Sequence, residues 1–317
     1  MGRNWPELER FVVKVFYSDH YTLPLPDGHR FPGTKYRLLR DYLIENKIIQ
    51  QSQLFESPLA SEDLLTLAHD RNYVRAMLTG EVDIQIIKRI GFPWSHGLYL
   101  RSCATVGGAV SAALSALDNR VSGNLAGGTH HAHYDRGEGY CVFNDIAVAA
   151  RHLIQLGHVR RVAIIDLDVH QGNGNSSILR DDPEIFIFSM HGEKNYPFKK
   201  VPSHLDIALP DGTGDEDFLD ALARGMLEIE NFAPDFIFYQ TGVDPLKEDK
   251  LGRMNLTFDG LSKRDECVLK FAADRGIPIS LALGGGYADP IELSVVAYAN
   301  TYRVVQKIFG SKQTNSI

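Results

Sequence analysis

The chain has 317 residues, with 33 Lys or Arg against 40 Asp or Glu, so its formal net charge is −7. Hydrophobic residues make up 44% and charged residues 23%, which is typical of a folded globular protein and excludes disordered, fibrous and membrane-embedded chains. The acidic balance argues against a protein that tracks nucleic-acid phosphates, and it fits cationic substrates in general without distinguishing among them.

The N-terminal end and the cysteines predict a cytoplasmic protein, or a nuclear one in a eukaryotic cell. Residues before Phe11 lack the apolar core of a signal peptide, and the first apolar stretch, Phe11–Tyr17, is too short to span a bilayer. The three scattered cysteines (Cys103, Cys141 and Cys267) do not match a disulfide framework or a zinc finger. Without a linker or repeat, residues 1–317 are expected to form one domain with no nucleic-acid or membrane partner. The oligomeric state stays open.

Short apolar runs alternate with helical patterns along the chain. Six runs are apolar throughout and rich in β-branched or aromatic residues, as in strands buried on both faces: 11–17, 121–125, 162–168, 185–189, 236–241 and 279–283. Helices are predicted at 35–45, 61–69, 98–117, 144–156, 216–231, 259–274 and 290–308, with Ser61 and Asp259 as caps. This alternation predicts an α/β domain with a mainly parallel sheet, whose ligand crevice lies beyond the carboxyl ends of the strands.

Two adjacent histidines follow the strand predicted at 121–125, within the segment Gly127–His131. Adjacent histidines in a loop are usually surface residues. At the carboxyl end of a strand, however, His130 and His131 become candidate acid–base groups, because imidazole titrates near neutral pH. Most other histidines are interpreted as solvated or structural, and two near the motif segments stay undecided: His133 and His191.

Carboxylates and a further histidine follow two later strands. In an extended chain Asp166, Asp168 and His170 would lie on one side, and Asp244 comes just after the strand at 236–241. Each segment alone could be an ordinary turn with a capping carboxylate. Together, two carboxylates and one imidazole are costly to bury without a cation, and they suit a zinc ion with open positions for water and substrate.

Three glycines and a tyrosine, Gly284–Tyr287, follow the last predicted strand. This segment is either a flexible turn or a mobile backbone that delivers one phenol to the site. The Tyr287 hydroxyl can donate a hydrogen bond to a developing oxyanion.

These segments resemble, in their order, the zinc-dependent histone deacetylase family of the arginase–deacetylase superfamily. The resemblance covers nearly the whole chain and rests on Gly127–His131, Gly139–Cys141, Asn144-Asp145, Asp166–Gly174, Gly242–Asp244 and Gly284–Tyr287. It implies a three-layer arginase–deacetylase fold with an eight-stranded sheet, two strands more than the pattern predicts, one of them within 207–209. Gln171 and Asn173, where many relatives carry His and Asp, are most similar to class IV and its bacterial relatives.

The resemblance also implies the cofactors and the tunnel. One zinc ion would be held by Asp168, His170 and Asp244. A structural potassium ion would be held by oxygens around Asp166, Asp168, His170, Ser189 and Met190. Gly139 and Tyr140 match the family's acyl-tunnel segment, and Tyr196 is placed on the opposing wall. Residues 81–96 show no match to the aspartate with which other branches grip the substrate backbone.

The expected reaction is hydrolysis of acyl-lysine-type amides, on proteins or on acylated polyamines. His131 would be general base and then general acid, oriented by Asn173. His130, oriented by Asp166, would tune the pair, and Tyr287 would stabilise the tetrahedral oxyanion. A non-catalytic acyl-lysine binding module is the less favoured alternative, because every ligand and the tyrosine are intact.

A single metal ion is expected, unlike in the arginases, which hold two manganese ions on this fold. A second ion needs carboxylates two residues from the first ligands. Those positions are Gly172, Gly242 and Leu246, none of which has a ligating side chain.

Overall fold

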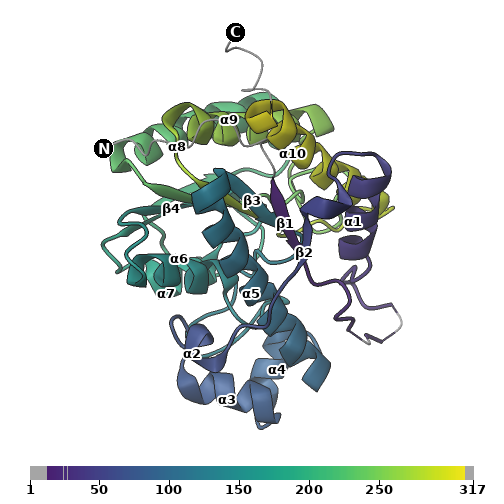
Figure 1. Ribbon diagram of the computed structural model, residues 1–317. Helices are drawn as coiled ribbons and strands as arrows, with labels where there is room; N and C mark the ends of the chain where they lie inside the picture. Colours follow the sequence, from purple (N-terminus) through teal and green to yellow (C-terminus); the bar gives the residue numbers. More distant parts are fainter. Residues whose placement is uncertain (1–12, 24, 27, 311–317) are drawn as a thin grey trace.

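The computed structural model describes residues 13–23, 25–26 and 28–310, in which a parallel sheet lies between two layers of helices (Figure 1). The eight strands are β1 Lys14–Tyr17, β2 Leu54–Glu56, β3 Val121–Asn124, β4 Val162–Asp166, β5 Ile185–Gly192, β6 Leu205–Leu209, β7 Phe236–Gln240 and β8 Ile279–Ala282. They run parallel in the order β2-β1-β3-β8-β7-β4-β5-β6. This is the eight-stranded sheet of the arginase–deacetylase fold.

Helices cover both faces of the sheet. They are α1 Lys35–Glu45, α2 Glu62–Leu65, α3 Arg71–Thr79, α4 Ile84–Ile90, α5 His96–Asn119, α6 Asp145–Gln155, α7 Asn173–Leu179, α8 Asp215–Phe232, α9 Phe258–Arg275 and α10 Glu292–Gly310. In Figure 1, α8, α9 and α10 lie above the sheet, α5, α6 and α7 lie below it, and α2, α3 and α4 extend beyond α5.

The core strands are buried on both faces, which explains their uninterrupted apolar runs. Every residue of β3, β4, β7 and β8 is buried, as expected for the centre of a parallel sheet. Helix α5 is long and apolar enough to span a membrane by length and composition, but 78% of its apolar window is buried inside the protein. Its contacts with β1, β3 and β8 make it a core helix.

The six predicted strands are confirmed with small differences at their ends, although residues 11–12 lie outside the described part of the chain. The prediction missed β2 and placed β6 only as a short segment at 207–209. Both strands lie at the edges of the sheet and are partly exposed. They therefore lack the continuous apolar run that marks the buried strands.

Three features of the predicted helices were wrong. Residues 61–69 hold only the short helix α2, which does begin after Ser61, whose hydroxyl accepts from the Leu64 amide. The cap of α9 is Thr257, not Asp259, which lies in the first turn. The prediction also missed α3, α4 and α7, each of nine residues or fewer, because so short a helix shows little periodicity.

Candidate active site

The four central strands bring the predicted groups together. Strand β3 leads to the two adjacent histidines, and its neighbour β8 leads to the glycine–tyrosine segment. The next strand, β7, leads to Asp244, and β4 beside it leads to the Asp166–His170 segment. Because parallel strands end at one edge, groups from distant parts of the chain meet there. A cavity at this edge is lined by His130, His131, Asp168, His170 and Tyr287.

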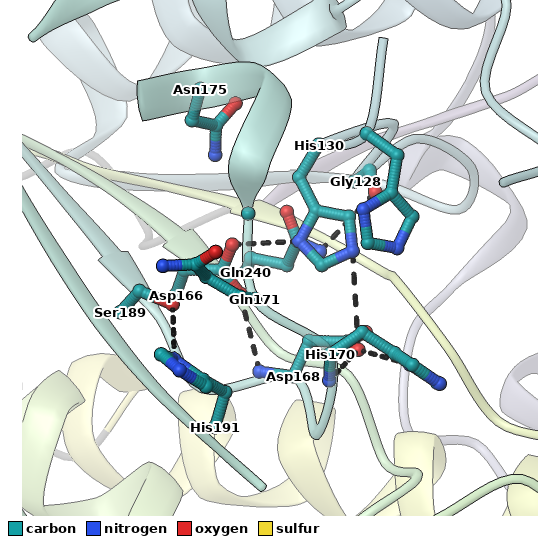
Figure 2. Close-up of polar contacts among 12 residues, drawn as sticks. Gly128, His130, Asp166, Asp168, His170, Gln171, Asn175, Ser189, His191 and Gln240 are labelled. Atoms are coloured by element: carbon teal, nitrogen blue, oxygen red, sulfur yellow. Dashed lines mark hydrogen bonds and ion pairs between the residues drawn. The ribbon is translucent and has the colours of Figure 1, made fainter. Parts of the chain in front are cut away.

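Asp168, His170 and Asp244 form the only group of metal-ligating side chains of this kind among the described residues. The His170 Nδ1 atom lies 3.0 Å from Asp168 Oδ1 (Figure 2) and 3.0 Å from Asp244 Oδ2. The two carboxylates are buried, and each also accepts a backbone N–H: His170 N donates to Asp168, and Val169 N donates to Asp244. Their oxygens are therefore fixed toward one point.

The turn after β4, rather than strand alternation, places these ligands. We expected an extended chain through residue 168, but β4 ends at Asp166. The Asp168 amide donates to Asp166 Oδ1 at 3.2 Å, and the His170 amide donates to Asp168 Oδ1 at 2.9 Å. This tight turn aims Asp166 at His130, while Asp168 and His170 face each other.

The chemistry of the three donors fits a divalent cation. Burial and the neighbouring Asp168 raise the pKa of Asp244 to about 7. Burial opposes charge on His170, yet both carboxylates outweigh it and raise its pKa to about 10. The point at which the three donor atoms converge therefore stabilises positive charge, and two carboxylates with one imidazole are a donor set that zinc accepts.

Glycines leave the space that the ligands occupy. A Cβ atom at Gly285 would lie 1.7 Å from Asp244 Oδ2, and one at Gly242 would lie 2.2 Å from Asp168 Oδ2. No side chain can therefore stand at Gly242, where a second metal ion would need a ligand. The donor set accordingly has the composition expected for one ion.

The two histidines have different hydrogen-bond partners. The His130 Nδ1 atom lies 2.7 Å from Asp166 Oδ2 (Figure 2), and the His131 Nδ1 atom lies 2.6 Å from Asn173 Oδ1. Burial disfavours the charged form of His130, but Asp166 and Asp168 outweigh it and raise its pKa. Burial, followed by the neighbouring histidines, holds the pKa of His131 well below its ordinary value. The neighbours thus favour the charged form of His130 and the neutral form of His131.

Glu138 is a residue that the sequence reasoning missed. Its Oε1 atom accepts hydrogen bonds from Asn173 Nδ2 at 2.8 Å and from the Tyr196 hydroxyl at 2.8 Å. Burial opposes its ionisation, but hydrogen bonds from His133, Tyr196 and Asn173 prevail and lower its pKa to about 2. A carboxylate can only accept, so it turns the Asn173 amide nitrogen toward itself and the amide oxygen toward His131.

His133, which the sequence left undecided, belongs to the same network. Its Nδ1 atom lies 2.6 Å from the Ser177 hydroxyl, which donates to the Gly174 carbonyl. Its Nε2 atom lies 3.1 Å from Asn173 Nδ2 and 3.5 Å from Glu138 Oε1. His133 therefore contacts both the amide that holds His131 and the carboxylate that holds this amide. The motif around His131 carries no local signal for these partners.

The glycine segment before Tyr287 makes several hydrogen bonds to side chains from other parts of the chain. The Gly285 amide donates to Asp168 Oδ2 at 2.6 Å, and the carbonyls of Gly284 and Gly286 accept from Lys35 Nζ. The Tyr298 hydroxyl donates to the Gly285 carbonyl. The glycines at 284 and 285 also allow the backbone to approach the Asp168 and Asp244 carboxylates closely.

Two charged residues outside the predicted set, one partly and one fully buried, hold the surrounding backbone. Asp249 Oδ2 accepts from the Tyr287 amide at 2.6 Å, and its other oxygen accepts from two amides of its own loop. Arg264, fully buried beside Asp265, donates to the carbonyls of Gly242 and Thr241. Neither residue follows a strand directly, so a position at a strand end does not predict them.

Tyr140 lines the cavity, and Tyr196 lines its outer end. Tyr140 has φ +65° and stacks on Phe92 at 5.2 Å between ring centroids, so a strained backbone holds this ring in place. The Tyr196 ring lies 4.9 Å from the His131 ring, and a Cβ atom at Gly139 would lie 2.7 Å from that histidine. The absence of a side chain at Gly139 thus lets the backbone of the cavity wall approach His131.

Three of the five expected potassium ligands lie on two adjacent strands, and the other two, Asp168 and His170, lie in the turn after β4. Asp166 and Ser189 are partners in the register of β4 and β5, and Met190 follows on β5. The Ser189 hydroxyl lies 3.0 Å from His191 Nδ1 (Figure 2). His191 therefore lies behind Asp166, on the side away from His130.

Comparisons with known proteins agree with this geometry. The histone deacetylase domain matches residues 29–302. An uncharacterised protein of the cyanobacterium Picosynechococcus is 40% identical over 93% of this chain and 99% of its own length. Histone deacetylase 2 of Arabidopsis thaliana is 28% identical over 87% of this chain and 74% of its own. The crystal structure of a histone deacetylase homologue from Aquifex aeolicus has a TM-score of 0.79 at 25% identity, covering 95% of this chain and 85% of that one. The chain therefore belongs to the histone deacetylase family and is a metal-dependent, hydrolytic deacetylase of the arginase–deacetylase superfamily.

Proposed function

We propose that the protein hydrolyses acyl-lysine-type amides with one zinc ion held by Asp168, His170 and Asp244. The observation that carries this proposal is the convergence of these three donors with an oriented neutral histidine, His131, in one buried cavity. A zinc ion held there supplies Lewis-acid polarisation of the acyl carbonyl and of the attacking water.

The residues of the chain would divide the proton transfers. Because Asn173 Oδ1 accepts from His131 Nδ1, the other nitrogen of this ring keeps a lone pair and can take a proton from water as that water attacks the carbonyl carbon. The same nitrogen then gives the proton to the leaving amine as the C–N bond breaks. The Tyr287 hydroxyl donates to the carbonyl oxygen as it gains charge. The products are a carboxylate and an amine.

Substitution of the proton-transfer groups tests this proposal. We expect His131→Ala to lose about 10²–10⁴-fold in kcat and Tyr287→Phe about 10²–10³-fold, because neither variant removes a metal ligand. The assay uses lysine peptides acylated from acetyl to myristoyl, with metal analysis of each variant. Tyr134→Phe, an exposed tyrosine, is the matched control. Near wild-type turnover in either variant would overturn the assignment.

The proposal also includes a potassium site, the subclass of the enzyme, its location in the cell and its substrate. Potassium would bind around Asp166 and Ser189, with Met190 beside them and with Asp168 and His170 contributing oxygens. Gln171 and Asn173 support a class IV-like enzyme; the Gln171 side chain hydrogen-bonds the Val201 backbone in both directions. Residues 1–317 would act as one cytoplasmic catalytic domain. Acylated polyamines are the alternative to protein lysines as substrates.

A further inference from the structure

The outer end of the active-site cavity, here called the mouth, carries charge of one sign. Four basic side chains line it: Arg30, Lys194, Lys250 and Arg253. They come from three separate loops, and no aspartate or glutamate lines the mouth among the described residues. In a chain with a net charge of −7, a rim of four cations is a local reversal of the overall charge.

Nearby carboxylates compensate only part of this charge. Lys194 and Arg253 share one acid, Asp211, at 3.6 and 3.3 Å, and Lys250 pairs with Asp289. Arg30 has no carboxylate partner among the residues that the structure describes. The Lys194, Lys250 and Arg253 side chains are more than half exposed, and exposed ion pairs of this kind hold their partners weakly. The rim therefore keeps an excess of positive charge.

The acid in the tunnel wall does not reverse this sign at the mouth. Glu138 already accepts hydrogen bonds from Asn173 and from the Tyr196 hydroxyl. Its side chain is 14% exposed, below the ring of Tyr196. A substrate that enters past Tyr140 and Tyr196 meets the basic rim first.

We propose that the natural substrate carries a carboxylate or phosphate beside its acylated amine, as in an acetyl-lysine flanked by acidic residues. This inference rests on the proposed amide hydrolysis and names its substrate class. A positive rim attracts anions and raises their association rate, whereas it repels acylated polyamines and lysine-rich tails. The overall acidity of the chain, taken alone, suggested the opposite preference.

Matched acetyl-lysine peptides test the proposal on the full chain. Three peptides of equal length carry Glu, Gln or Lys at the flanking positions, and kcat/KM is measured at low and at high salt. We expect the acidic peptide to exceed the basic one by about tenfold or more at 20 mM salt, and by less than about threefold at 0.5 M salt.

A pair of small substrates separates a peptide source from a small-molecule source. The anion 6-acetamidohexanoate and the cation N-acetylcadaverine place opposite charges at nearly the same distance from the amide. If the small anion is hydrolysed as well as the acidic peptide, the substrate is a small acylated amine. If only the acidic peptide is hydrolysed well, the substrate is a protein. In both cases the anion must exceed the cation.

Paired substitutions localise the effect. Lys194→Gln combined with Arg253→Gln should abolish most of the preference for the acidic peptide. Lys270→Gln combined with Lys307→Gln changes the net charge equally at residues that do not line the mouth, and should keep the preference. Equal or better hydrolysis of the basic peptide by the wild type would overturn the inference. If neither the acyl peptides nor the two small amides are hydrolysed, whatever their charge, the proposed function itself is wrong.

Discussion

The floor and the mouth of the same cavity are built in opposite ways. The floor is made of buried carboxylates and imidazoles at the ends of the four central strands, each fixed by backbone amides or a hydrogen-bonded partner. The mouth is made of exposed basic and aromatic side chains from loops, with weak or shared partners. The floor is thus preorganised for one reaction, while the mouth can change without affecting the fold.

This difference predicts how each region responds to substitution. A buried polar group that loses its partner costs the full desolvation of that partner, so changes at the floor are large. An exposed side chain usually changes stability by less than about 0.5 kcal/mol, so changes at the mouth affect recognition alone. The substitutions below test this contrast.

The largest effect is expected when a ligand at the floor is removed. Asp244→Asn should lose at least about 10³-fold in kcat/KM, because an amide neither neutralises the cation nor balances His170. Metal analysis should show a matching loss of bound ion. Asp259→Asn, an exposed acid on α9, is the control and should keep both. If Asp244→Asn kept stoichiometric metal and full activity, the expected difference between floor and mouth would be wrong.

A purely steric change at the floor should have the next largest effect. In Gly285→Ala every donor atom stays, but the new Cβ atom would lie 1.7 Å from Asp244 Oδ2 and must displace it. We expect metal affinity to fall about 10–100-fold, as when the supports of a ligand are disturbed. Gly33→Ala is the control, since a Cβ atom there meets nothing within 4 Å. Unchanged metal affinity would show that the floor tolerates displacement.

The sequence predicted the parts of the floor that follow strand ends. Asp168, His170, Asp244 and the histidine pair stand directly after apolar runs, and a parallel sheet must bring such positions to one edge. Five of the eight strands were predictable because they are buried on both faces, whereas β1 was predicted from its apolar run although only Val15 in it is buried. The edge strands β2 and β6 share their faces with solvent and carry a weaker pattern.

What the sequence could not predict are contacts between residues far apart in the chain with no pattern of their own. Glu138 meets Asn173 across 35 residues, and Lys35 meets Gly284 across 249. The basic rim is harder still, because Arg30, Lys194 and Arg253 are ordinary surface residues until the fold gathers them. The net charge is a sum over the whole chain, so it does not show that these basic residues lie together.

An intermediate effect is expected at Glu138, which lies between floor and mouth. Glu138→Ala should lower kcat about 10–100-fold, because the Asn173 amide can then turn its nitrogen toward His131. Glu138→Gln keeps an acceptor and should lose only about fivefold, the difference between a charged and a neutral hydrogen bond. Bound metal should be unchanged in both. Equal losses in the two variants would mean that the charge, rather than the amide orientation, matters.

The smallest effect is expected at Phe198, whose side chain is 89% exposed at the mouth and whose ring lies 6.4 Å from that of Tyr196. Because the ring buries little surface in the folded chain, Phe198→Ala should change the free energy of unfolding by less than about 0.5 kcal/mol. A substrate that covers this ring would lose about 1 kcal/mol of apolar contact, so KM should rise about fivefold with kcat unchanged. Leu227→Ala, an exposed apolar residue on α8 outside the mouth, should leave KM unaltered. A fall in kcat for Phe198→Ala would contradict the separation of recognition at the mouth from chemistry at the floor.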